Sequence, residues 1–317
     1  MDTQIPDSLE EADSSEEVRN WLELPPDVMS LIFLKLGAID ILFRAQSVCS
    51  AWRKLSKEPQ LYRLVDMRNR WDLFDGDEYD MEKMAREAVD RSCGQLVEFS
   101  VEHFGTDELL QYIADKSGSL RCLRLVSCYQ VSDDGLIKMA NKLPMLEELE
   151  ICHCSFSEEM LEAVGHACPQ LKLFRLNCRG FRRPHIECDE EALAIAKNMP
   201  QLRHLHLFGN KLTNDGLRAI LDGCPHLESL DLRQCFNVNL EGDLLKRCKD
   251  RLRKLRLPED STDDYEFDDA IDGDGSFDEE YPSGFSEIDF LSDDGYYEFS
   301  EGSYLSDYDD LDLGFNF

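Results

Sequence analysis

A leucine pattern with a period of about 25 residues is the feature that most constrains the fold. The motif L-x-x-L-x-L and its variants occur seven times between residues 96 and 257. The copies begin at Leu96, Leu120, Leu146, Leu171, Leu202, Leu227 and Leu252, at intervals of 24, 26, 25, 31, 25 and 25 residues. A repeat of this length cannot bury its apolar face alone, so neighbouring copies are expected to stack into a solenoid.

Each copy contains the signals for one strand and one helix. The alternating apolar residues predict a short strand, and a residue that can cap a helix follows it. The caps expected in five copies are Thr106, Ser132, Ser157, Asp189 and Thr213. We therefore predict an α/β leucine-rich-repeat solenoid over residues 96–257, with a parallel sheet on its concave side. Residues 67–95 are expected to form a linker and a first solenoid helix, from Asp80 to Ser92.

The segment Trp21–Leu64 is short, apolar and divided into three predicted helices. Pro25 and Pro26 open the first helix and Gly37 ends it; Asp40 begins the second, and Pro59 stops the third. A bundle of about 40 residues buries too little surface to be secure by itself. Its apolar residues lie on more than one side of the first helix, which predicts an apolar face presented to another protein.

Several positions in this segment resemble the F-box motif, which we assign to residues 21–66. The matching residues are Leu24-Pro25, Ile32-Phe33 to Leu36, Asp40 to Leu42, Val48-Cys49 and Trp52-Arg53. The resemblance implies docking on the Skp adaptor of an SCF-type cullin ubiquitin ligase, with the rest of the chain recruiting a substrate. The docking residues implied are Leu24, Pro25, Ile32, Leu36, Val48, Cys49 and Trp52. A plain three-helix subdomain packed on its neighbour is the alternative.

Cysteines at the ninth place of the repeats extend this resemblance. Cys128, Cys154 and Cys235 stand at that place, and Cys-Pro precedes two of the following leucines. This arrangement is similar to the cysteine-containing repeats of the plant F-box and leucine-rich-repeat group. Because the repeat explains most of the twelve cysteines, we expect neither a zinc site nor disulfides.

Charge limits the classes of partner. The net charge is −32, and residues 258–317 contain 22 Asp or Glu, 13 Phe or Tyr and no Lys or Arg. We predict a disordered acidic N-terminus over residues 1–20 and a disordered, acidic, aromatic-containing tail over residues 258–317. Nucleic acid is not an expected partner, because phosphate binding requires a basic face. The apolar runs are too short to span a membrane, so we expect no membrane partner and a nuclear or cytoplasmic location, or both.

The outward-facing strand positions are the candidate substrate site. The fifth and seventh places of the repeats supply Arg124, Val126, Glu150, Cys152, Arg175, Asn177, His206, Phe208, Asp231 and Arg233. One hypothesis is a partner segment lying across Val126 to Phe208. The alternative is that the fifth-place charges, which nearly alternate in sign, pair with one another. A basic loop from Arg179 to His185 is a second candidate, either for capturing an acidic segment or for contacting the acidic tail.

No motif in the sequence predicts catalysis. It contains no phosphate-binding glycine loop, no serine elbow and no HExxH, so we expect a non-catalytic protein without cofactors or metals. The preferred hypothesis is a substrate-recognition subunit of an SCF-type ubiquitin ligase. The alternative is an acidic leucine-rich-repeat scaffold that binds basic nuclear proteins without a ligase role. A third hypothesis is an F-box protein whose adaptor complex does not assemble on a cullin.

Overall fold

The structure is a computed structural model that describes residues 21–68, 80–154, 156–178 and 186–265. The chain divides into two compact units, Met1–Thr262 and Asp263–Phe317. The predicted disordered N-terminus, the Arg179–His185 loop and the tail from residue 266 onward lie outside the described residues. The predictions made for those segments therefore stay predictions.

The first unit begins with a helical segment. Its elements are η1 (Trp21–Glu23), α1 (Pro26–Asp40), η2 (Ile41–Ala45), α2 (Gln46–Val48), α3 (Ser50–Leu55) and η3 (Pro59–Tyr62). Gly37 has a φ of 80° and kinks α1, so the helical turn after it has a new direction, as the glycine predicts. The prediction for Pro59 was wrong. The third helix ends at Leu55, and Pro59 instead opens the short helix η3, where its fixed φ is favourable.

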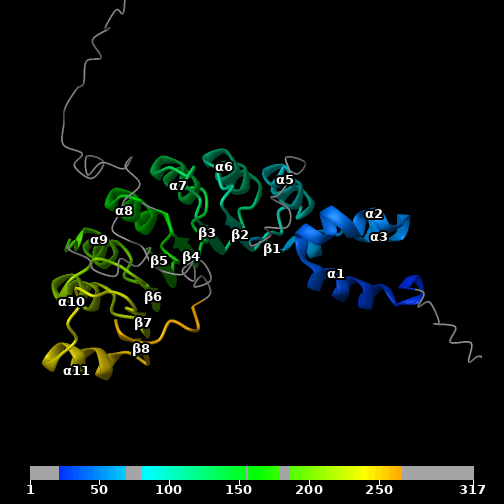
Figure 1. The fold of residues 1–317 in the computed structure, drawn as a ribbon. Coiled ribbons are helices and arrows are strands. Elements are labelled where there is room, and N and C mark those ends of the chain that lie inside the picture. The colour runs from blue at the N-terminus through cyan, green and yellow to red at the C-terminus, as the bar shows by residue number, and fades with distance from the viewer. Residues whose placement is uncertain (1–20, 69–79, 155, 179–185, 266–317) are drawn as a thin grey trace, which may run out of the picture. The chain divides into compact units, whose positions relative to one another are not determined.

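A parallel sheet of eight strands follows in the described residues, ordered β1 to β8 as in the sequence (Figure 1). The strands are β1 (Leu64–Met67), β2 (Glu98–Glu102), β3 (Cys122–Val126), β4 (Glu148–Cys152), β5 (Leu173–Asn177), β6 (His204–His206), β7 (Ser229–Asp231) and β8 (Lys254–Arg256). The predicted repeat places are in register from strand to strand. The fourth places, for example, align Phe99, Leu123, Leu149, Phe174, Leu205, Leu230 and Leu255.

Helices cover one face of this sheet and lie on the outer side of the repeats (Figure 1). They are α5 (Met81–Arg91), α6 (Asp107–Lys116), α7 (Asp133–Ala140), α8 (Glu158–Ala167), α9 (Glu190–Asn198), α10 (Asn214–Gly223) and α11 (Gly242–Arg251). Apolar side chains from the helices and from the fourth and sixth strand places, such as Leu123, Leu125 and Leu136, are fully buried between the two layers. The predicted α/β solenoid is confirmed.

Four of the five predicted helix caps are confirmed. The hydroxyls of Thr106, Ser132, Ser157 and Thr213 accept a hydrogen bond from a backbone N–H in the first turn that follows. Asp189 stands at the predicted N-cap position of α9, but its carboxylate makes no such bond. It accepts instead from the N–H and the hydroxyl of Thr213, at 2.7 Å each. Asp189 therefore ties one repeat to the next.

The sheet begins one repeat earlier than predicted. β1 pairs in parallel with β2, so residues 64–67, predicted as the end of the F-box and the start of the linker, form a strand of the repeat sheet. In this first copy Tyr62, Val65 and Met67 occupy the leucine places, and all three are buried. The leucine pattern does not reveal this first copy, because none of these three residues is leucine.

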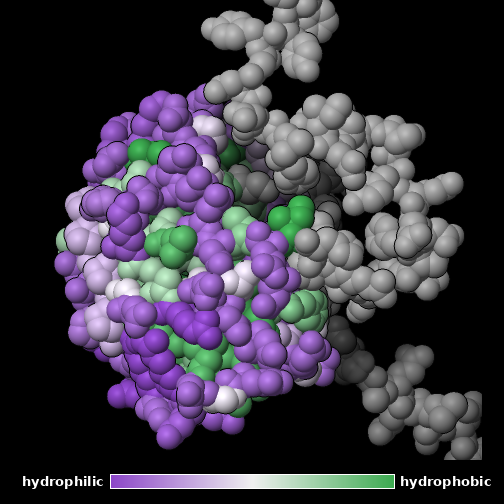
Figure 2. Space-filling model, turned by 90° about the vertical axis from the view of Figure 1, so that its left-hand side faces the viewer, coloured by the Kyte–Doolittle hydropathy of each residue, from purple (hydrophilic) through white to green (hydrophobic). Residues whose placement is uncertain are grey.

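The outer surface is mainly polar. Figure 2 faces the side on which α9–α11 lie in Figure 1, and its hydrophobic residues form small patches separated by hydrophilic ones. Within the described residues no helix is both long enough and apolar enough to cross a membrane.

Candidate functional site

The kinked helix α1 divides its apolar residues between two environments. Met29 and Phe33 are buried, and the Phe33 ring packs edge-on against Trp52 of α3 with ring centroids 5.4 Å apart. Leu31, by contrast, is 59% exposed, and Val48 at the end of α2 is 62% exposed. Other large apolar side chains that remain exposed in this segment are Trp21, Val28, Leu34 and Leu36. This concentration of uncovered apolar surface is typical of a protein-binding face.

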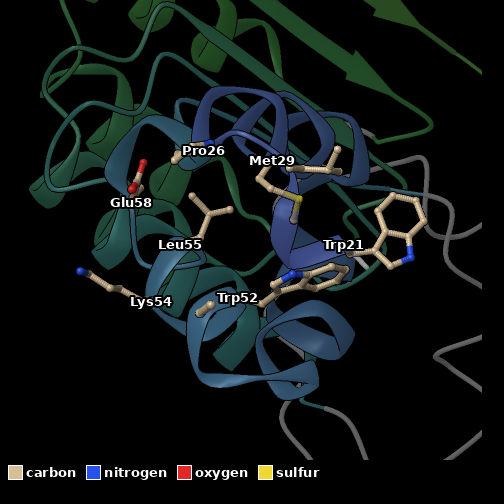
Figure 3. Close-up of a pocket in the computed structure, with 9 residues that line it drawn as sticks. Trp21, Pro26, Met29, Trp52, Lys54, Leu55 and Glu58 are labelled. Carbon is tan, nitrogen blue, oxygen red and sulfur yellow. The ribbon is translucent and has the colours of Figure 1, made fainter. Parts of the chain in front are cut away.

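A pocket of about 330 Å³ opens between α1 and α3, and of these exposed residues Trp21 lines it. It is lined by Trp21, Leu24, Pro26, Met29, Ala51, Trp52, Lys54, Leu55 and Glu58. Figure 3 shows Met29 on one side of the pocket, Trp52 and Leu55 on the facing helix, and the charged residues Lys54 and Glu58 beyond them. An apolar pocket with a charged rim is suited to receive an apolar side chain of a protein partner.

The second candidate surface, on the concave face of the sheet, is a ladder of charges at the fifth places. Glu150 lies between two arginines, with its Oε2 3.4 Å from Arg124 Nε and 3.1 Å from Arg175 Nη1. Arg124 also reaches Ser100 Oγ at 3.4 Å. These contacts are the self-pairing that the sequence analysis gave as the alternative.

His206 and Asp231 continue the ladder toward the C-terminal repeats. Burial, together with the positive charge of Arg175, lowers the pKa of His206 to about 4. Burial raises the pKa of Asp231, but hydrogen bonds from Arg233 outweigh this and hold it below its ordinary value. Arg233 Nη2 lies 2.7 Å from Asp231 Oδ2, and both side chains are almost fully buried. This pair is therefore part of the packed structure.

The hypothesis of an open strip at the seventh places was wrong. Val126, Cys152, Asn177, Phe208 and Arg233 are between 0 and 6% exposed. Asn177 Nδ2 donates to Cys152 Sγ at 3.1 Å, and the Arg233 guanidinium lies over the Phe208 ring. A partner segment cannot rest on these side chains in this conformation.

Comparisons with known proteins agree with this architecture. Residues 21–68 match the "F-box-like" family model, and residues 90–190 and 177–271 match the model "FBD-associated F-box protein At5g56370, LRR repeats". The chain is 50% identical over 301 residues to "F-box protein SKIP19" of Arabidopsis thaliana, covering 94% of this chain and 95% of that one. This chain belongs to the F-box proteins with leucine-rich repeats.

The chain is also similar to a longer relative and, weakly, to solved structures of repeat proteins. "Putative F-box/LRR-repeat protein 23" of Arabidopsis thaliana is 51% identical over 252 residues, covering 78% of this F-box protein and 55% of the relative. Among solved structures, an internalin of Listeria monocytogenes is 15% identical with a TM-score of 0.35, covering 57% of this chain and 45% of that one. A TM-score this low supports no inference about function.

The residues that the F-box motif singled out lie in three settings. Leu24 and Trp52 line the pocket, Pro25, Leu36 and Val48 are exposed, and Ile32 and Cys49 are half-buried. Cys49 also caps α3, with its Sγ 3.5 Å from the N–H of Trp52. Trp21 was not among the predicted docking residues, although it lines the pocket and is 47% exposed.

The cysteines of this F-box protein are thiols without disulfide partners, and burial raises the pKa of several of them, as at Cys122 and Cys128, to about 12. Among the described residues no three His, Cys, Asp or Glu side chains lie together as a metal site would require.

Proposed function

We propose that this F-box protein is a substrate-recognition subunit of an SCF-type cullin ubiquitin ligase. The observation that carries the proposal is the uncovered apolar surface of the F-box, with Leu31, Leu34 and Val48 exposed and a pocket at Trp52. A folded segment gains little by exposing such side chains unless a partner covers them. In the proposed complex the Skp adaptor covers this face and connects the chain to a cullin.

The repeats hold the protein to be ubiquitinated. Solenoids of stacked repeats offer extended binding surfaces, and the chemistry of ubiquitin transfer is assigned here to other subunits. The chain acts by raising the effective concentration of its substrate near those subunits. The alternative of an acidic scaffold for basic nuclear proteins is disfavoured, because that class of protein has no F-box.

Complex assembly tests the proposal. The full chain, a Skp-type adaptor and the N-terminal half of a cullin are mixed, and the species are separated by size-exclusion chromatography. We expect a ternary complex of one copy each. A complex with the adaptor alone would support an F-box protein that works without a cullin. If the chain elutes alone, the adaptor role is wrong.

A further inference from the structure

The residues that immediately precede the strands form a continuous stripe that crosses all the repeats at the end of the sheet where the strands begin. We call it the edge stripe. Its members are Arg63, Val97, Arg121, Glu147, Lys172, Arg203, Glu228 and Arg253. Each carbonyl, up to that of Glu228, accepts two backbone N–H groups of the next repeat. Arg203 O, for example, accepts from Glu228 N at 2.8 Å and Ser229 N at 3.0 Å. This bonding holds the eight residues in register.

The edge stripe carries more positive than negative charge. It contains five Lys or Arg and two Glu, in a chain whose net charge is −32. Each glutamate is shared between two cations. Glu147 pairs with Arg121 and, at 2.6 Å, with Lys172; Glu228 pairs with Arg203 at 2.7 Å and Arg253 at 2.8 Å. One carboxylate neutralises only one cation, so each of these triads keeps a net positive charge.

The cations of the stripe are accessible to a partner. The side chains of Lys172, Arg203 and Arg253 are between 46 and 82% exposed. Exposed ion pairs contribute only about 0–1 kcal/mol, so an incoming carboxylate can share these cations without breaking a strong contact. The buried pair of Asp231 and Arg233, at the other end of β7, offers no such opportunity.

We propose that Lys172, Arg203 and Arg253 bind an extended, acidic segment of the protein that this receptor recruits. The proposal rests on the receptor function proposed above and names the chemistry of its substrate. Lys172 and Arg253 are three strand steps apart, or about 14 Å, which an extended peptide spans with about four residues. Arginine forks are suited to carboxylates.

The charge of the rest of the chain favours a short acidic segment over a long polyanion. The whole chain carries a net charge of −32, which opposes the approach of a long polyanion. Nucleic acid requires a broad basic face, whereas the stripe is only one residue wide in each repeat. A stripe of net positive charge on a chain of net negative charge therefore favours a short acidic peptide.

Peptide binding tests this proposal. The probe is a fluorescein-labelled peptide of about 12 residues in which Glu and Ser alternate, and the control peptide has Gln in place of Glu. Fluorescence anisotropy with the full chain at low salt is expected to show binding of the acidic peptide only. Raising the salt to about 0.3 M is expected to weaken binding, because charge pairs at a surface are screened.

Two double variants locate the site. Arg203→Gln with Arg253→Gln is expected to weaken binding of the acidic peptide about tenfold. The matched control, Arg218→Gln with Arg247→Gln, removes two similarly exposed arginines that pair with Asp215 and Asp222 on the helical face. The control is expected to bind the peptide as the native chain does. Equal binding by both double variants would overturn the proposal.

A third variant tests the sign of the charge effect without removing an arginine. Glu228→Gln leaves Arg203 and Arg253 in place but removes the carboxylate that they share. We expect binding to tighten about two- to threefold, and weaker binding would contradict the proposal.

Binding seen only with a chain ending at Thr262 would make residues 263–317 the occupant and overturn assignment to a partner. All these variants should bind the Skp-type adaptor with the affinity of the native chain. A failure of the acidic-peptide proposal is therefore distinguishable from a failure of the proposed receptor function.

Discussion

The guanidinium of Arg91 donates a hydrogen bond to the phenolic oxygen of Tyr62 at 3.1 Å, and this contact connects the F-box to the solenoid. Arg91 stands at the end of α5, and it also reaches Ser56 O at 3.0 Å and Gln46 Oε1 at 2.8 Å. The Tyr62 hydroxyl in turn donates to Ser56 O at 2.6 Å. One arginine thus holds α2, the end of α3 and η3 against the first solenoid helix.

Replacing Arg91 is expected to loosen this junction. Arg91→Ala leaves the buried Tyr62 hydroxyl and the Ser56 carbonyl with fewer partners, and we expect the free energy of unfolding to fall by about 2–4 kcal/mol. Urea denaturation monitored by circular dichroism measures this change. The matched control on the same helix is Arg86→Ala, whose ion pair with Glu82 is more exposed, with an expected loss of about 1 kcal/mol. Equal losses for the two variants would contradict the role given to Arg91.

Gly135 tests how the repeats are tied together. A Cβ at this position would overlap the carboxylate of Asp107, which accepts hydrogen bonds from Ser132 N at 2.8 Å and Ser132 Oγ at 2.6 Å. Alanine favours a helix by about 1 kcal/mol over glycine, but loss of bonds to the charged Asp107 costs more, at about 1.5–3 kcal/mol each.

We therefore expect Gly135→Ala to lower the midpoint of thermal unfolding. Gly118→Ala, where the added Cβ meets no atom within 4 Å, is the control and is expected to leave the midpoint unchanged within about 2 °C. A stabilised Gly135→Ala variant would show that Asp107 does not tie adjacent repeats.

The lowered pKa of His206 predicts that the folded protein loses stability in mild acid. Burial lowers its pKa in the folded protein to about 4, whereas an unfolded histidine titrates near 6.5. The unfolded chain therefore binds the proton more readily, and the contribution of neutral His206 to stability is lost as the pH falls from about 6.5 through 4.

The pH dependence of two variants measures this effect. Between pH 7 and pH 5, His206→Gln is expected to lose less unfolding free energy than the native chain, by an amount on the order of 1 kcal/mol. His226→Gln, which changes an exposed histidine, serves as the control and should follow the native chain. Identical pH dependence in all three proteins would contradict the burial of a neutral His206.

The cysteines should differ sharply in reactivity. Cys93 is exposed, whereas Cys122 and Cys128 are buried and have pKa values raised to about 12 by that burial. Since the thiolate is the reactive form, iodoacetamide at about pH 8 should label Cys93 long before the other two. Peptide mass spectrometry of the native and the urea-unfolded chain measures this order. Rapid native labelling of Cys128 would show that the ninth-place cysteines are not core residues.

The repeat fold could be predicted from sequence because leucine spacing determines which side chains enter the core. The first repeat could not, since Tyr62, Val65 and Met67 carry no leucine pattern and lie within the segment that matches the F-box model. Alternation along a strand identifies the outward face but not how closely the next strand covers it, so the burial of Cys152 and Phe208 required coordinates.

The F-box was recognisable from sequence because its motif residues have a fixed spacing, but the division of α1 into buried and exposed sides was not. Phe33 is buried, and Trp52 of α3 packs edge-on against its ring, a contact between two helices that the motif spacing does not specify. The edge stripe was accessible to sequence analysis, since its members directly follow the first leucine place of each repeat. It was missed because only the outward strand positions were considered.

The affinity for a Skp-type adaptor tests the central claim most directly. The double variant Leu36→Ser with Val48→Ser removes two exposed apolar side chains of the F-box, and the control Tyr129→Ser with Leu193→Ser removes two exposed apolar side chains of the repeats. Burial of each side chain contributes about 1.5 kcal/mol or more, so we predict that the dissociation constant rises at least about tenfold in the F-box variant. The control should keep the native value. Equal affinities for the two folded variants would contradict the assignment of this F-box face as the adaptor site.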